Sequence, residues 1–146
     1  MGFQFSLQTV LQFRENEEKR EEIKLQQLGA QIVRVQDELD QLAVLMRETS
    51  LRRAGMLAES STAFHLQAIQ GEIDQARRRQ GELELHIDSL EQQKVEQVRE
   101  YQQKRTARNI LDEMHKQQRE AFNKEQSVQE QKRLDDIFAT RIQRDA

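Results

Sequence analysis

The stretch LQQLGAQIVRVQDELDQLAVLMRET, residues 25–49, decides the fold. Its apolar residues return in alternating steps of three and four, as follows: Leu25, Leu28, Ile32, Val35, Leu39, Leu42 and Met46. This spacing is the a/d repeat of a left-handed coiled coil. The residues between them are mainly polar, so the apolar stripe is narrow. Such a stripe is typical of a helix that packs against one partner helix.

A second stripe with the same spacing follows later in the chain, and it can supply that partner. Its members are Leu66, Ile69, Ile73, Ala76, Gln80, Leu83, Ile87, Leu90, Lys94, Gln97 and Tyr101. Between the two stripes, Gly55 suits the position after a helix end, and Ser61 or Thr62 suits the N-cap of a new helix. Folding back at this point pairs the two stripes in antiparallel layers, for example Leu28 with Ile87 and Glu21 with Lys94. A parallel homodimer would also bury the first stripe, but it would leave this agreement unexplained.

The sequence therefore predicts an all-α fold, a long antiparallel two-helix coiled-coil hairpin with a C-terminal helical overhang. We expect one domain over residues 1–146, with helix 1 at about 6–53, the turn at about 54–61 and helix 2 at about 62–142. The last third of helix 2 has no partner left in helix 1. Because a lone helix is marginal in water, this overhang is expected to fray or to be held by something else.

Composition narrows the function classes. The chain has 146 residues, with no Cys, no Pro and a formal net charge of −3. The lack of Cys excludes disulfides and thiolate metal sites. No apolar run reaches the roughly 18 residues of a membrane span, and the N-terminus does not resemble a secretion signal. The mixed charge does not favour non-specific binding of nucleic acid.

Residues for catalysis or metal binding are sparse. No two of His65, His86 and His115 lie four residues apart, and Asp112 with His115 gives only half of a di-metal helix motif. No Gly-rich phosphate loop or catalytic triad is recognisable. We therefore expect a protein that is not an enzyme and holds neither cofactor nor metal. The basic patches 77–79 and 104–108 are interpreted as solvated faces, with docking as the alternative.

The two ends of the chain carry a resemblance to a known family. FQFSLQTVL at residues 3–11 and RENEEK at 14–19 look like the opening of the flagellar export protein FliJ family. EQKRLDDI at residues 130–137 is similar to that family's tail. The length, the composition and the single hairpin also fit, so the resemblance covers the whole chain.

The resemblance implies a soluble part of the flagellar type III export apparatus, similar to the central stalk of rotary ATPases. It implies a cytoplasmic location at the flagellar base, peripheral to the inner membrane through protein partners only. Those partners are the hexameric export ATPase, the cytoplasmic domain of the export gate and export chaperones, with no nucleic acid among them.

The resemblance also implies two sets of contact residues. The paired termini would bind the export ATPase through Phe3, Phe5, Leu7, Leu11, Arg14, Leu111, Phe122, Leu134 and Ile137. The hairpin-tip half, residues 38–49 and 69–80, would bind the export gate through Leu42, Leu45, Thr49, Ile69, Ile73 and Ala76. For the residues of the tip that belong to the stripes, packing within the hairpin is the competing interpretation.

Two other functions stay open on the sequence alone. One is a generic coiled-coil scaffold or dimerisation protein without an ATPase partner. The other is a protein that binds nucleic acid or a membrane surface through its arginine patches.

Overall fold

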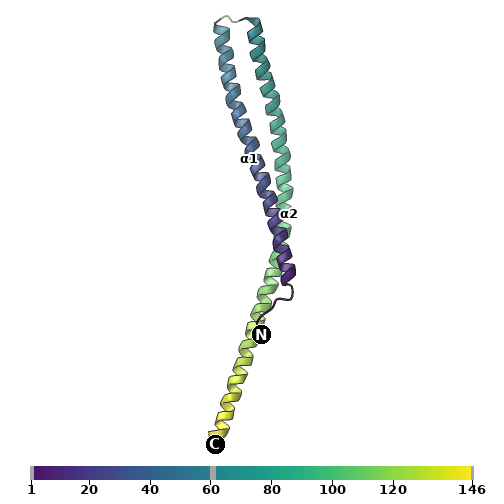
Figure 1. The fold of residues 1–146 in the computed structure, drawn as a ribbon, viewed down its shortest axis with the longest axis vertical. Helices are drawn as coiled ribbons and strands as arrows, with labels where there is room; N and C mark the ends of the chain where they lie inside the picture. Colours follow the sequence, from purple (N-terminus) through teal and green to yellow (C-terminus); the bar gives the residue numbers. More distant parts are fainter. Residues whose placement is uncertain (1, 60–61, 146) are drawn as a thin grey trace. The chain divides into compact units, whose positions relative to one another are not determined.

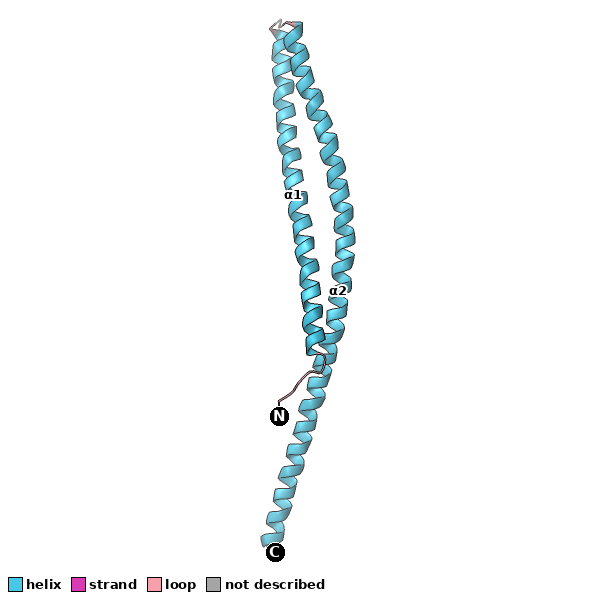
Figure 2. Cartoon of the chain, turned by 45° about the vertical axis from the view of Figure 1, so that its right-hand side comes forward, coloured by secondary structure: helices cyan, strands magenta, loops and turns pink. Residues whose placement is uncertain are grey.

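The computed structural model describes residues 2–59 and 62–145, which form two α-helices, α1 (Gln8–Ala58) and α2 (Ala63–Asp145) (Figures 1 and 2). No strand occurs among these residues, so the all-α two-helix hairpin is confirmed. Contacts divide the chain into a hairpin unit, Glu21–Tyr101, and a terminal unit, Met1–Arg20 with Gln102–Ala146. We describe each unit by itself, and the single domain over residues 1–146 stays a prediction.

The hairpin unit is held by the two predicted stripes. Every stripe position of α1 from Leu25 to Thr49 is buried or half-buried. The centre of the core is formed by Val35, Leu83 and Leu90, against which five half-buried residues pack: Leu28, Ile32, Leu39, Leu42 and Ile87. Along α2 the stripe is buried or half-buried as well, except for Lys94, which is exposed because its charged end stays in water.

The helix ends differ from the expectation in one place. The prediction that helix 1 ends near residue 53, with Gly55 just beyond it, is wrong, because α1 continues to Ala58. The Glu59 N–H donates to the Gly55 carbonyl at 3.1 Å, and the half-buried Met56 lines a groove together with Ile69 of α2. A glycine inside a helix costs only about 1 kcal/mol, which the following Met, Leu and Ala can offset.

The other ends agree better with the prediction. α1 begins at Gln8 instead of about residue 6, and α2 runs from Ala63 to Asp145. Thr62 caps α2, since its Oγ1 accepts a hydrogen bond from the His65 N–H at 3.4 Å. Ser61, the other candidate for this cap, lies outside the described residues.

The longer α1 changes how the helices pair. Glu21 was expected to face Lys94, but Gln97 is its partner. Nε2 of Gln97 donates to the Glu21 carbonyl at 3.1 Å and also to the Glu21 carboxylate. Extending α1 past Gly55 moves the fold-back point toward the C-terminus, so residues of α1 meet residues further along α2. The predicted Glu21–Lys94 layer is therefore wrong.

The terminal unit has a different construction. Residues before Gln8 form a non-helical segment, which we call the N-terminal arm (residues 2–7). The arm packs on α2 through Phe3 and Phe5. Residues 123–145 of α2 are helical and exposed at every position. No helix among the described residues is long and apolar enough to cross a membrane.

Candidate functional site

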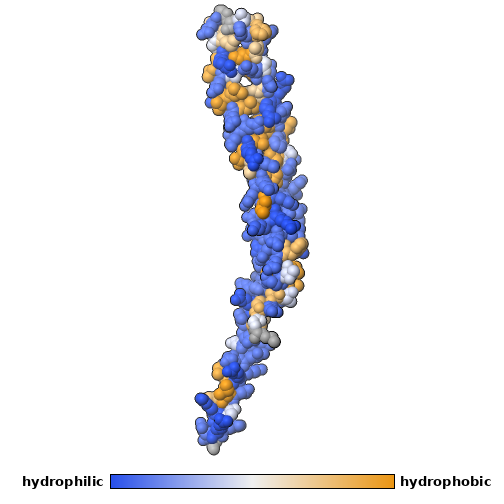
Figure 3. Space-filling view, viewed as in Figure 1, coloured by the Kyte–Doolittle hydropathy of each residue, from blue (hydrophilic) through white to orange (hydrophobic). Residues whose placement is uncertain are grey.

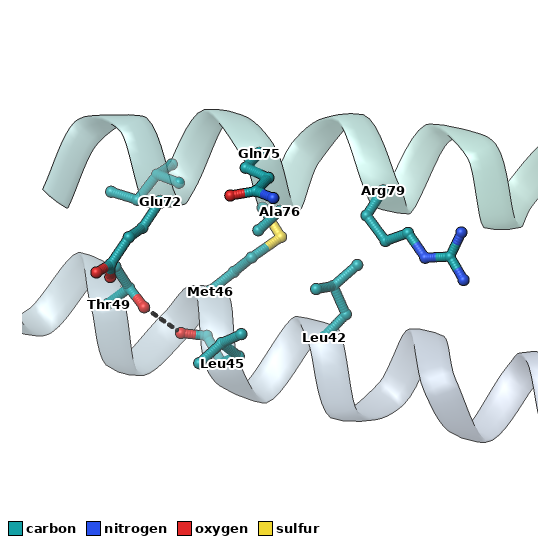
Figure 4. A pocket seen from close by; sticks show the side chains of 9 residues that line it. Leu42, Leu45, Met46, Thr49, Glu72, Gln75, Ala76 and Arg79 are labelled. Atoms are coloured by element: carbon teal, nitrogen blue, oxygen red, sulfur yellow. Dashed lines mark hydrogen bonds between the residues drawn. The ribbon is translucent and has the colours of Figure 1, made fainter. Parts of the chain in front are cut away.

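The hairpin unit carries a groove of about 420 Å³ between α1 and α2 (Figure 4). Five of the six residues expected to bind the export gate line it, namely Leu42, Leu45, Thr49, Ile73 and Ala76. The sixth, Ile69, lines a neighbouring groove of about 320 Å³, and Glu72 lines both. The structure therefore brings this predicted set together on one stretch of the hairpin.

Small side chains at two stripe positions open this groove. Ala76 ends at Cβ, so it leaves space beside Leu42 and Met46 that a leucine would fill. Thr49 is buried, and its hydroxyl donates to the Leu45 carbonyl at 2.7 Å while it accepts from Arg52 at 3.4 Å. Because its hydroxyl is hydrogen-bonded, Thr49 can be buried in the hairpin although it is polar.

The six residues differ in what they offer to a partner. Thr49, Ile69, Ile73 and Ala76 are buried, which supports the competing interpretation that they pack the hairpin. Leu45 lies off the stripe and its surface is 49% exposed. Leu45 is therefore the predicted gate residue that is best placed for direct contact, while the buried residues shape the groove beneath it.

Charged pairs border the groove. Arg79 forms ion pairs with Glu38 at 2.8 Å and Glu82 at 3.3 Å, and Arg52 pairs with Glu72 at 3.5 Å. The hydrogen bond that Arg79 donates to Glu38, followed by the one that it donates to Glu82, raises the pKa of Arg79 above its usual value. All these side chains are about half exposed, so the pairs can exchange for charges on a partner at little cost.

In the terminal unit, the residues expected to bind the ATPase separate into two groups. Most of them are at least half-buried in the packing of the chain: Phe3, Phe5, Leu7, Leu11, Arg14, Leu111 and Phe122. Leu134 and Ile137 instead are about half exposed on α2. Their neighbours Phe138 and Ile142, whose spacing in the sequence also fits a helical face but which were not among the expected ATPase contacts, are exposed as well.

Aromatic contacts fix the N-terminal arm. The ring of His115 lies 4.8 Å from that of Phe5 and 5.5 Å from that of Phe3, and the Phe3 ring is also 5.5 Å from Phe122. Phe5 and Leu11 are the most buried residues of this unit that the structure describes. Tilted and edge-on rings at such distances attract each other beyond the burial of their surface.

An ion-pair network joins α1 and α2 in the same unit. Arg108 donates to both carboxylate oxygens of Glu18 and to Asp112, and Lys104 lies 3.9 Å from Glu17, which also pairs with Arg14 at 3.0 Å. The bonds with Glu18 and then Asp112 raise the pKa of Arg108. From the sequence, Arg108 is expected to belong to a solvated patch. Its place in the stripe spacing after Tyr101 was the signal that it faces α1.

The comparison with protein families decides the identity. The family model described as flagellar FliJ protein matches residues 3–146. The chain belongs to the FliJ family. The resemblance found at the two ends is therefore confirmed over essentially the whole chain, which makes it a component of the flagellar export apparatus. No curated protein and no solved structure matches the chain.

This FliJ-family chain shows no cluster suited to a metal among residues 2–59 and 62–145, where no three His, Asp or Glu side chains converge. His115 contacts phenylalanine rings, and His65 contacts Thr62. The described surfaces of this FliJ-family chain carry apolar grooves, exposed apolar side chains and ion pairs.

Proposed function

We propose that the chain is a non-enzymatic stalk and adaptor of the flagellar type III export apparatus. Its paired termini bind the hexameric export ATPase, and its hairpin-tip half binds the cytoplasmic domain of the export gate. It acts in the cytoplasm at the flagellar base, peripheral to the inner membrane through these partners. Escort of export chaperones belongs to the same proposal.

The observation that carries the ATPase contact is the uncovered apolar surface near the end of α2. Leu134 and Ile137 are 51% and 47% exposed in a helical stretch whose every residue faces water. Such a stretch is marginal alone, and fully burying each side chain would contribute roughly 2 kcal/mol to binding. The packed residues, with Phe5 and Leu11 as the most buried, support binding indirectly by holding the arm and α1 on α2.

The gate contact is supported by the groove in the hairpin unit. Its apolar lining, the exposed Leu45 and the exchangeable pairs of Arg52 and Arg79 suit a protein partner with an apolar side chain between charges. In this proposal Leu45 makes direct contact, Leu42 and the buried Ile73 shape the groove beneath it, and the buried Ile69 shapes the neighbouring groove.

A pull-down and a hydrolysis assay with the export ATPase test the first contact. We expect Leu134→Asp/Ile137→Asp to lower capture and ATPase stimulation at least about tenfold, because two carboxylates would have to be buried. Ala139→Asp/Gln143→Asp is the matched control, since it adds the same charge to another face of the same helical stretch. Equal binding by both variants, with unchanged helicity, would rule out this contact surface.

Binding to the purified cytoplasmic domain of the gate tests the second contact. Leu45→Asp is expected to abolish binding, whereas Val44→Asp, at a similarly exposed neighbour outside the groove, should bind normally. If Leu45→Asp binds as well as the unaltered chain, the groove is not the gate-binding surface.

A further inference from the structure

α2 carries another heptad-spaced stripe in the terminal unit, on a face distinct from that of Leu111, His115 and Phe122. It continues in steps of three and four, and its apolar members are Ala107, Ile110, Met114, Ala121, Val128, Phe138 and Ile142. The large residues of this set are exposed, with Ile110 at 58% and Phe138 at 65%. Figure 3 shows apolar side chains at the C-terminal part of α2 in a largely hydrophilic surface. This outer stripe has the spacing of a helix-packing surface, and its members from Ile110 onward are exposed, whereas Ala107 is half-buried.

The outer stripe has a mirror-symmetric pattern. Ile110 and Met114 are four residues apart at its beginning, and Phe138 and Ile142 are four residues apart at its end. A second copy running in the opposite direction would place Ile110 against Ile142 and Met114 against Phe138. Both pairs would form twice, as they do in a two-fold symmetric contact.

Charges beside the stripe favour the same arrangement. Glu113 directly precedes Met114, and Arg141 directly precedes Ile142, so an antiparallel second copy brings Glu113 opposite Arg141. Neither residue forms an ion pair with another described residue. A parallel arrangement would instead stack Lys124 on Lys124 and Asp135 on Asp135, which repel each other.

We propose that a second copy of this chain packs antiparallel on the outer stripe, with Ile110, Met114, Phe138 and Ile142 as the apolar layers at its two ends. The middle of the stripe is polar, with Gln117, Lys124, Gln131 and Asp135, so the dimer forms and dissociates readily with concentration. This contact explains how the exposed residues 123–145 of α2 stay helical. It does not depend on the proposed binding of the ATPase.

Sedimentation equilibrium of the full chain over a range of concentrations tests the dimer. We expect the mass to rise from 17.3 kDa toward twice that value. Met114→Glu/Phe138→Glu should raise the dissociation constant at least about tenfold, because it buries like charges in both Met114–Phe138 layers, one at each end of the contact. Asn123→Glu/Gln126→Glu adds the same charge to outward positions and should dimerise normally. A constant mass of 17.3 kDa for the unaltered chain, at every concentration, would overturn the proposal.

Charge reversal tests the antiparallel direction. Glu113→Arg and Arg141→Glu alone should each weaken the dimer about tenfold through two repelling pairs, and the double variant should restore it. Far-UV circular dichroism of each variant separates a lost contact from a lost helix. Failure of the double variant to recover, with helicity intact, would overturn the Glu113–Arg141 pairing and with it the antiparallel register.

Cross-linking gives an independent measure, because the chain has no cysteine of its own. A short bismaleimide should join Met114→Cys to Phe138→Cys in a mixture of the two variants, while neither variant alone should form a covalent dimer. Covalent dimers of each variant alone, without the mixed product, would show a parallel contact and overturn the proposal. These experiments contain no ATPase, so their failure leaves the proposed function standing.

Discussion

The hairpin unit and the terminal unit use the same helical spacing but fill it with different chemistry. In the hairpin unit the stripe of α2 carries Leu83 and Leu90, both 3% exposed, among other aliphatic residues. In the terminal unit the same steps of three and four lead through Lys104, Arg108 and His115. Spacing therefore decides that two helices pair, whereas the side chains at the stripe decide how firmly they are held.

The terminal unit compensates for its charged stripe in two ways. Glu17 and Glu18 of α1 pair with the cations of α2, and the N-terminal arm adds the rings of Phe3 and Phe5. Ion pairs depend on geometry and weaken with salt, whereas apolar burial does not. We therefore expect α1 to separate from α2 at a lower free energy in the terminal unit than in the hairpin unit.

The largest expected effect is a cavity in the hairpin unit. Leu83→Ala should lower the free energy of unfolding by about 3 kcal/mol, because the deleted methyl groups belong to the centre of the core. Leu85→Ala removes the same atoms from a side chain that is 72% exposed, so it should change the free energy of unfolding by less than about 0.5 kcal/mol. Urea denaturation followed by circular dichroism measures both. Equal effects of the two variants would contradict the observed packing of α2.

A smaller loss is expected when the arm is released. Phe5→Ala removes a buried ring and its edge-on contact with His115, so the terminal unit should lose about 2 kcal/mol of local stability. Amide hydrogen exchange should rise in residues 8–20 and remain unchanged around Leu83. Phe13→Ala, at a 56% exposed position, is the control. Faster exchange around Leu83 in Phe5→Ala would contradict this prediction, because it would mean that the arm also stabilises the hairpin unit.

The sequence was sufficient to predict the stripes of the hairpin unit. Aliphatic side chains at regular steps of three and four form one face of a helix, and that face is buried against a partner helix because it avoids water. It did not predict the register, since that depends on where α1 ends. Gly55 has no conformational need to end a helix. Met56, which is half-buried and lines a groove together with Ile69, favours continuation through a long-range placement. A difference of five residues at one helix end was enough to replace Lys94 by Gln97 opposite Glu21.

The candidate surfaces were predicted less completely. The predicted hairpin already brings Leu45 close to Ile73 and Ala76. The groove itself was not predicted, because it also depends on the small side chain of Ala76. Burial of Phe5 on His115 was not predictable, because a non-helical arm has no period that points it to a neighbour. The exposed apolar residues near Phe138 are proposed to contact the export ATPase or a second copy of the chain, and this remains a prediction.

The ion-pair network allows a finer comparison of the units. Glu18→Gln keeps the size of the side chain but removes its charge, and should cost the terminal unit about 1 kcal/mol at low salt and less in high salt. Glu22→Gln, at an exposed position of α1, is the control. Hydrogen exchange of residues 8–20 at two ionic strengths measures the difference. A cost that does not fall with salt would show that packing, and not charge, is lost.

The same network predicts how Arg108 responds to pH. Its pKa is raised by Glu18 and Asp112, so its stabilising contribution is present below the pKa of an unfolded arginine and is lost only as the pH rises beyond it. Titration of Arg108 therefore adds no pH dependence near neutrality. If Arg108→Gln changed the slope of stability against pH around neutrality, another titrating group would have to be coupled to it.

The smallest expected effect concerns Arg79. Like Arg108, it pairs with one carboxylate of α1 and one of α2. The Arg79 side chain is 51% exposed, whereas that of Arg108 is 25% exposed, and Glu38 is 48% exposed where Glu18 is 14% exposed. Water screens the exposed pair, and the apolar layers beside it already hold the helices together. Arg79→Gln should therefore leave the urea midpoint of the hairpin unit unchanged, as should Arg78→Gln. A lower urea midpoint for Arg79→Gln alone would mean that the ion pairs at the rim of the groove stabilise the hairpin. Ion pairs and apolar layers would then both contribute to stability in both units.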